Sequence, residues 1–236
     1  MVRVEHVMGM PVVVEVRDGE VGDDVFDWFR HVDETFSTYK QGSEVSRIRR
    51  GELALADASD EVREVYARCD ELRRETSGFF DIAAVDGDPS GYVKGWAVDR
   101  AAELLTGEYA VNAGGDIRTR GRWRIGIQHP LEKGAVAQVL EGDDLAVATS
   151  GTYERGEHVR DPHSGYAPAG ILSVTITGPD LATADAYATA AFAMGGHRAP
   201  NWTARLAGYE AMTILADGRV LLTPGFPQAP PEPSGD

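Results

Sequence analysis

The sequence predicts an α+β fold, formed as a single compact unit of two associated α/β halves with mixed sheets. Apolar residues recur at helical spacing through much of the first 107 residues, whereas short segments rich in β-branched residues and separated by turns fill 109–177. One more helix and a hairpin follow. The 236 residues are 42% hydrophobic, which is enough to supply one core.

One strand and three helices are expected in the N-terminal half. A run of valines predicts the strand, and apolar residues three to four apart predict the helices, of which the second ends before Ser77-Gly78 and the third at Gly107. The expected ranges are 12–16 for the strand and 25–36, 62–72 and 98–105 for the helices.

The C-terminal half is expected to contain most of the strands. Turn residues separate six short strands, expected over 109–112, 117–119, 123–127, 136–140, 145–149 and 172–177. A helix over 183–194 should end at Gly195-Gly196, and 211–215 should pair with 220–223 as a hairpin.

Two segments are expected: a folded domain over 1–223 and a disordered, proline-rich tail over 224–236. The tail has too few apolar side chains to offset the entropy lost on ordering.

The composition narrows the classes of partner. The formal charge of −15 repels phosphate backbones and anionic lipids, so we expect no nucleic-acid partner. A polyanionic ligand would need a lysine or a metal ion beside it. The single cysteine, Cys69, excludes an intramolecular disulfide and thiolate-built metal sites, and it is expected to serve packing.

No segment approaches the roughly 20 apolar residues that span a bilayer, so no membrane insertion is expected. The first ten residues carry Arg3, Glu5 and His6 in place of an apolar run. The chain as given is therefore expected in the cytoplasm, although the mature form of an exported protein would look the same.

Asp185 and Thr189 are the first candidate site residues. They lie four apart on an expected helix, so a carboxylate and a hydroxyl project from one face. Oxygen ligands suit Mg²⁺, which completes its shell with water or substrate phosphates. The alternative is structural: Asp185 serves the helix start and Thr189 packs.

A turn-rich loop over 88–95 opens the third helix and contains Lys94. Free N–H groups at a helix start favour anions, and Lys94 would add a positive charge there. The alternative is a solvated lysine. The loop lacks the spaced glycines and the Lys-Ser/Thr pair of a P-loop.

Two further segments could belong to a site. Asn112 to Asp116 interrupts two strands with paired glycines, which suits a close ligand or a tight hairpin whose Asp116 bonds only within its own turn. His158 could be a general base, a ligand contact or a histidine fixed by a local hydrogen bond. Ser150 does not lie in a nucleophile elbow, which argues against a hydrolase triad.

Taken in order, eight segments together resemble the ApbE family, the FAD:protein FMN transferases. They are Met8-Gly9, 37–39 with 43–46, 76–81, 91–99, 112–116, 149–151, 158–162 and 183–189. The resemblance covers about residues 8 to 195.

The resemblance implies an activity. Members of the family bind FAD with Mg²⁺ in a cleft between the two halves, cleave its pyrophosphate, pass FMN to a threonine hydroxyl of an acceptor flavoprotein and release AMP. The partners implied are therefore FAD and an acceptor flavoprotein that carries the target threonine.

The resemblance also implies site residues. The metal ligands carry over to Asp185, Thr189 and the backbone carbonyl of Gly91, and the catalytic residues to Asp185 and His158, the latter near the transferred phosphate. The FAD contacts carry over to Met8, Tyr39, Phe79, Phe80, Asp81, Asp88 and Lys94.

The chain departs from the family between Asp81 and Asp88. Only six residues separate them, where relatives usually carry a longer insertion. A more open cleft would admit water as well as an acceptor, so two alternatives remain: a metal-dependent FAD pyrophosphatase that gives FMN and AMP, and a non-catalytic FAD-binding protein.

Overall fold

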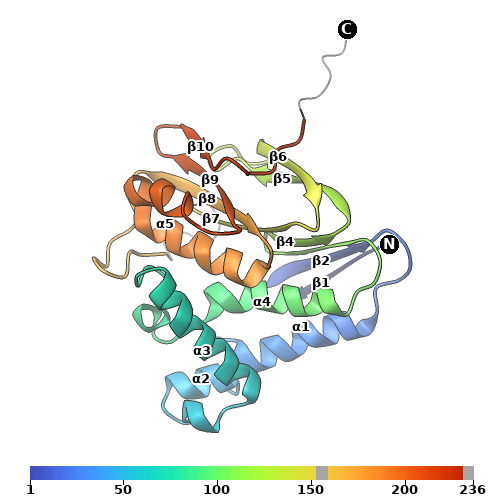
Figure 1. The fold of residues 1–236 in the computed structure, drawn as a ribbon. Coiled ribbons are helices and arrows are strands. Elements are labelled where there is room, and N and C mark those ends of the chain that lie inside the picture. Colours follow the sequence, from blue (N-terminus) through green and yellow to red (C-terminus); the bar gives the residue numbers. More distant parts are fainter. Residues whose placement is uncertain (153–158, 231–236) are drawn as a thin grey trace.

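The computed structural model describes residues 1–152 and 159–230 and arranges them in three layers (Figure 1). The middle layer is an eight-stranded sheet in the order β1-β2-β3-β4-β7-β8-β9-β10. Its strands are β1 Val2–Val7, β2 Met10–Val16, β3 Tyr109–Ala113, β4 Asp116–Arg120, β7 Ala146–Gly151, β8 Ile171–Gly178, β9 Glu210–Leu215 and β10 Val220–Leu222.

Helices form a second layer on one face of this sheet (Figure 1). They are α1 Asp23–Phe36, α2 Glu44–Arg49, α3 Asp60–Glu75, α4 Ser90–Glu103 and α5 Leu181–Thr203, with 3-10 turns η1 Leu55–Asp57 and η2 Ile82–Val85. Helices α4 and α5 contact the sheet and each other, and α1 packs behind α4.

A two-stranded ribbon of β5 Arg122–Gln128 and β6 Val136–Asp143 forms the third layer. Along β7, Ala146 and Ala148 belong to the main core while Val147 belongs to a smaller cluster with Ile125 and Leu140 of the ribbon. Successive side chains of a strand face opposite sides of its sheet. The ribbon therefore covers the face opposite the helices.

The α+β class is confirmed, and the expected strands and helices are present, but the pairing of the strands differs from the expectation. Every described strand pair is antiparallel, whereas mixed sheets were expected. The long segment between β2 and β3 shows why: its helices return the chain to the end where β2 stopped, so Val16 pairs with Tyr109. A return to the same end gives an antiparallel neighbour.

Two elements are missing from the expectation. Strand β1 lies at the sheet edge with only Val7 buried, and Arg3, Glu5 and His6 interrupt its valines, so it lacks the apolar run of β2. It joins β2 through Met8 and Gly9, both at positive φ, as a two-residue hairpin requires. Helix α2 has six residues, too few to show a helical period.

Helix α5 runs past its expected end. The backbone leaves helical values at Gly195 (φ 71°) and a second helical segment follows to Thr203. A Cβ on Gly195 would lie 2.9 Å from the Ala169 oxygen, and one on Gly196 would lie 2.2 Å from the Gly170 oxygen. The paired glycines therefore permit a kink and a close backbone contact where a helix stop was expected.

The proline-rich segment is packed as far as the structure describes it. Phe226 is 4% exposed in the smaller cluster, and the Ala229 N–H donates to the Val139 oxygen at 2.9 Å. The expectation of disorder from residue 224 is therefore wrong for 224–230. One aromatic side chain buries enough apolar area to anchor a short segment that composition alone marks as unstructured.

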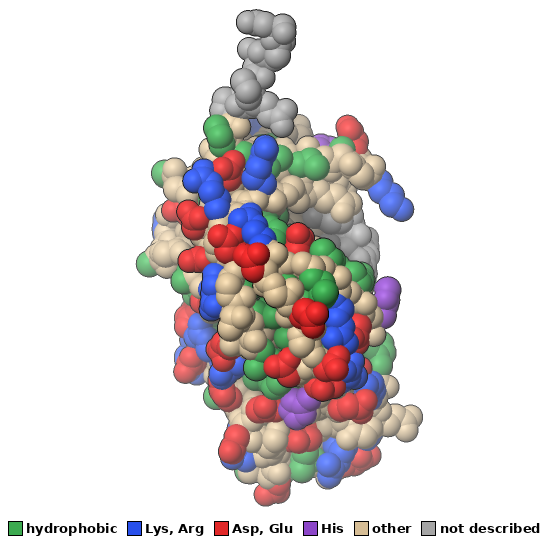
Figure 2. Space-filling model, turned by 90° about the vertical axis from the view of Figure 1, so that its right-hand side faces the viewer, with side chains coloured by type: hydrophobic (Ala, Val, Ile, Leu, Met, Phe, Trp, Pro, Cys, Tyr) green, Lys and Arg blue, Asp and Glu red, His purple; other side chains and the backbone are tan. Residues whose placement is uncertain are grey.

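The surface and the lone cysteine agree with the composition. On the face shown in Figure 2, acidic and basic side chains are interspersed. Within the described ranges, no helix combines the length and the apolar character needed to cross a bilayer. Cys69 is 1% exposed on α3, and burial raises the pKa of its thiol to about 12, which supports a packing role.

Candidate functional site

The predicted metal ligands come from α4 and α5, which pack against each other. Asp185 is 3% exposed, and its Oδ2 accepts a hydrogen bond from the Gly95 N–H at 3.3 Å. One turn later, Thr189 Oγ1 lies 3.5 Å from Ser150 Oγ. A Cβ on Gly91 would lie 3.6 Å from Thr189 Oγ1, so the Gly91 backbone lies against that hydroxyl.

Glycines allow the two helices to approach this closely. A Cβ on Gly95 would lie 2.6 Å from the Leu181 oxygen, which no side chain can occupy. The Gly95 N–H is also the normal helical partner of the Gly91 carbonyl. A carbonyl oxygen has two lone pairs, so the Gly91 carbonyl keeps acceptor capacity beside that hydrogen bond.

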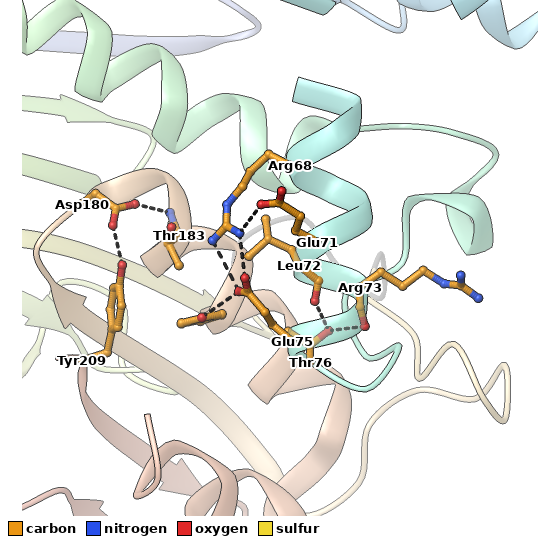
Figure 3. A network of polar contacts seen from close by, with 10 residues as sticks. Arg68, Glu71, Leu72, Arg73, Glu75, Thr76, Asp180, Thr183 and Tyr209 are labelled. Atoms are coloured by element: carbon orange, nitrogen blue, oxygen red, sulfur yellow. Dashed lines mark hydrogen bonds and ion pairs between the residues drawn. The ribbon is translucent and has the colours of Figure 1, made fainter. Parts of the chain in front are cut away.

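The start of α5 is fixed to α4 by Asp99. Its Oδ2 accepts hydrogen bonds from the N–H groups of Leu181 at 2.8 Å and Ala182 at 2.9 Å. Burial raises the pKa of Asp99 to about 6, although these N–H groups oppose the shift. Asp180 caps the same helix through the Thr183 N–H at 2.8 Å, and Figure 3 shows its second oxygen meeting Tyr209.

Lys94 lies inside α4, one turn from its start, where the sequence placed it in a loop. Its side chain is 17% exposed, and Nζ lies 2.8 Å from Asp116 Oδ2 and 3.9 Å from Asp185 Oδ1. The reading of Lys94 as a solvated surface lysine is therefore wrong.

Asp116 lies beside Lys94, whereas the sequence predicted only that its segment lies close to a ligand or forms a tight hairpin, with no site role for Asp116. It is fully buried at the start of β4, and its Oδ1 accepts the Thr149 N–H at 3.3 Å. Its Oδ2 has no hydrogen bond of standard geometry within the described residues, so charge attraction to Lys94 is its main compensation. The sequence offered one indication of a site role for Asp116, its position directly after the paired glycines Gly114-Gly115. A tight turn explains the same pattern without any ligand.

A cavity of about 650 Å³ opens beside Lys94, between the main sheet and the ribbon. Its walls combine polar groups with an apolar floor, formed by residues 9–11, Lys94, Asn112, Gly114, Gly115, Ile117, 125–128, Val147 and Thr149. A mixed lining of this kind suits a ligand with flat ring systems and polar linkers.

The residues predicted to contact FAD differ in their position relative to this cavity. Lys94 lines the cavity, and Met8, at φ 56°, precedes Gly9 on its wall. Phe80 is buried, and its Cε2 would lie 3.3 Å from a Cβ on Gly91. Tyr39 is 92% exposed in the loop after α1 and does not line the cavity.

Asp81 and Asp88 shape the short loop between α3 and α4. Asp81 accepts hydrogen bonds from the Ala83 N–H and from Arg73 Nε, both at 2.9 Å. Asp88 accepts the Ser90 N–H at 2.9 Å, at the start of α4. Both side chains therefore have local structural roles, and their contact with FAD stays a prediction.

A polar network supports the loop that carries Phe79 and Phe80. Thr76 Oγ1 donates to the Leu72 oxygen at 2.8 Å, as drawn in Figure 3, and accepts the Phe80 N–H at 2.9 Å. Glu75 pairs with Arg68 at 2.7 Å (Figure 3) and accepts the Tyr187 hydroxyl. The network ties the end of α3 to α5.

The Phe79 ring already has two neighbours. His163 packs edge-on at 4.6 Å between centroids, and the Arg198 guanidinium lies 5.6 Å from the ring centre. His163 Nε2 also lies 3.1 Å from the Ser77 oxygen. These contacts fix the ring, so a flavin would meet its remaining surface. His158, a predicted catalytic residue, lies outside the described residues.

The site formed by Asp185, Thr189 and Gly91 suits a cation whose remaining ligands are water or phosphate oxygens. Within the described ranges, no three side chains of His, Cys, Asp or Glu gather as a metal cluster. The candidate ligands are the carboxylate of Asp185, the hydroxyl of Thr189 one turn later and the Gly91 backbone, which lies against that hydroxyl. A hard cation such as Mg²⁺ accepts this set when water or phosphate oxygens complete its shell.

Comparison with known proteins gives the family. The model of the ApbE family matches residues 8–86 and 83–213. An FAD:protein FMN transferase of Vibrio cholerae is 35% identical over 138 residues, which are 50% of this chain and 41% of that protein. One of Rhodobacter capsulatus is 32% identical over 158 residues, 60% of this chain and 30% of that protein. The chain thus matches less than half the length of these relatives.

Solved structures share the fold. The ApbE protein of Thermotoga maritima superposes with a TM-score of 0.82 at 22% identity, covering 95% of this chain and 97% of that one. The flavin transferase ApbE of Vibrio cholerae gives 0.83 at 21% identity, covering 96% and 97%. At this identity the likeness establishes the architecture.

Proposed function

This chain belongs to the ApbE family, and from that membership we propose that it transfers FMN from FAD to a threonine hydroxyl of an acceptor flavoprotein and releases AMP. The observation that supports the proposal is that α4 and α5 bring Asp185, Thr189 and the Gly91 backbone near Lys94, which lines the cavity. Such a centre fits a pyrophosphate bound with a cation.

Phosphoryl transfer depends mainly on position and charge, so it needs no nucleophile from this chain. In the proposed complex, Lys94 contributes its ammonium to the pyrophosphate oxygens, and the buried Ser150 lies beside Thr189. The acceptor threonine supplies the attacking oxygen. His158 is proposed to take the proton from that hydroxyl.

Asp185, Thr189 and the Gly91 carbonyl are proposed to hold Mg²⁺. When bound, Mg²⁺ would neutralise phosphate oxygens that the acidic surface of this chain repels. Asp185 would supply the only carboxylate charge in that set, so it should dominate the affinity for the cation.

The test is to incubate the protein with FAD and Mg²⁺, with and without a flavoprotein that carries a candidate threonine, and to weigh the products. We expect an acceptor heavier by one covalently attached FMN and an equal amount of AMP. Asp185→Asn should remove both products without lowering the melting temperature, because the amide oxygen can still accept the Gly95 N–H.

Two outcomes would favour the rival activities. Rapid release of FMN and AMP with no modified acceptor, across several candidates, would identify an FAD pyrophosphatase. Tight FAD binding without AMP, even with metal and acceptor, would identify a binding protein. Full transfer by Asp185→Asn would remove Asp185 from the metal site.

A further inference from the structure

Lys94, Asp116 and Asp185 form a buried charge cluster, which we call the Lys94 cluster. One ammonium from α4 faces one carboxylate from β4 and one from α5. The exposed fractions of the two aspartates are 0% and 3%. Burying charges to this degree costs free energy unless they are paired. The distance of the Lys94 ammonium from each carboxylate therefore affects the stability of the cluster.

The ammonium is shared unequally. Nζ lies 2.8 Å from Asp116 Oδ2, an ion-pair contact, and 3.9 Å from Asp185 Oδ1, beyond hydrogen-bond distance. Asp116 is itself fixed, because Thr149 of β7 donates its N–H to the other oxygen at 3.3 Å. A shift of about 1 Å would bring Nζ into hydrogen-bond distance of Asp185.

A lysine and a metal ion compete for the same carboxylate. An ammonium bonded to Asp185 would neutralise the only carboxylate in the proposed metal site and would repel an incoming cation. Asp116 offers the ammonium a second, fixed partner from outside that ligand set.

We propose that Asp116 is a positioning residue that holds Lys94 Nζ away from Asp185 and so preserves Asp185 as a ligand for a divalent cation. The inference rests on the proposed function, since it takes Asp185 as the metal ligand. It assigns Asp116 no contact with the metal or with FAD.

The experiment measures Mn²⁺ binding without FAD or acceptor, from the electron paramagnetic resonance signal of free Mn²⁺. Asp116→Asn should weaken Mn²⁺ binding by about tenfold, a usual loss when a residue that supports a metal ligand is changed. Lys94→Met should bind Mn²⁺ at least as tightly as the wild type. The double variant Lys94→Met/Asp116→Asn should match Lys94→Met, because no ammonium remains to be held.

The double variant separates this role from a simple charge effect. If the Asp116 charge attracts the metal directly, the loss persists in the Lys94→Met background, and the inference fails. Unchanged Mn²⁺ affinity in Asp116→Asn also overturns it, while the proposed metal site stands. Absence of Mn²⁺ binding by the wild type overturns both.

Two controls complete the design. Glu103→Gln removes the same charge from an exposed position of α4 and should leave Mn²⁺ affinity unchanged. Melting curves check the fold of each variant. If Asp116→Asn melts below the assay temperature, Asp116→Ser replaces it, since serine keeps an acceptor for the Thr149 N–H.

Discussion

Some residues of the candidate site have two roles, because the same side chain stabilises the fold and lines the cavity. Lys94 illustrates this: it pairs with Asp116 inside the protein while lining the space beside the sheet. Its place near the start of a helix could be predicted from sequence, although the structure puts it inside α4 and not in the preceding loop. Its partner could not, since Asp116 follows 22 residues later on a strand whose position depends on the whole sheet.

The first prediction concerns the charge of Lys94. Lys94→Met keeps most of the side-chain volume but removes the ammonium, so FAD affinity should fall by about tenfold or more, the usual worth of a hydrogen bond to a charged group. The loss should shrink at high salt, because ions screen the phosphate contact in the wild type. FAD fluorescence titrations at two ionic strengths measure both effects. Equal affinities at low salt would separate Lys94 from the ligand.

At the scale of elements, the contact between α4 and α5 decides the geometry of the site. Sequence periodicity predicted both helices, and the spacing of Asp185 and Thr189 predicted that they share a face. It could not predict which helix would pack opposite. That depends on Gly95, whose missing side chain allows the approach, and on Asp99, whose carboxylate receives the start of α5.

The second prediction tests the close approach. Gly95→Ala places a Cβ 2.6 Å from the Leu181 oxygen, so the helices must separate, and the free energy of unfolding should fall by about 1–3 kcal/mol. Transfer activity should fall further, since Gly91 and Thr189 move apart. Gly42→Ala, where no atom lies within 4 Å of the new Cβ, is the matched control for chemical denaturation. Equal stability of the two variants would show that the contact tolerates a side chain.

The third prediction uses the pKa of Asp99, which burial raises from 3.8 to about 6 in the folded protein. Between these values the folded state binds more protons than the unfolded state, so this residue lowers stability as pH rises. Asp99→Asn keeps the acceptor for the α5 N–H groups but cannot titrate. The wild type should lose about 2 kcal/mol relative to the variant between pH 4 and pH 7.

Urea denaturation of wild type and Asp99→Asn at several pH values checks this difference. Other titrating groups contribute equally to both proteins and cancel. A stability difference that stays constant from pH 4 to pH 7 would mean that Asp99 titrates normally.

At the scale of the whole molecule, the three layers depend on contacts between distant segments. Turn signals predicted the strands, but not the packing of the ribbon, which depends on the second apolar cluster that joins β5, β6, β7, β9 and Phe226. The composition of the proline-rich segment predicted disorder, because the average hydrophobicity of a segment does not show that a single aromatic ring, here Phe226, is buried.

The fourth prediction tests that anchor. Phe226→Ala removes a ring that is 4% exposed, so the free energy of unfolding should fall by about 3–5 kcal/mol, as for other buried aromatic residues. Val220→Ala, at a position 51% exposed, should change it by less than about 0.5 kcal/mol. Thermal denaturation compares the two. A similar small loss in both would mean that the cluster is complete without Phe226.

The contacts between α4 and α5 also follow a regular spacing along both helices. Gly91 meets Thr189, Gly95 meets Asp185, and Asp99 meets Leu181, so each step of four along α4 matches a step of four back along α5. One residue added to or deleted from either helix within these contacts would rotate the following positions by about 100°. Every later pair of contacting residues would then be separated. Within 91–99 and 181–189, changes are therefore limited to substitutions at positions that do not make these contacts, while changes of length are confined to loops such as the one between Asp81 and Asp88.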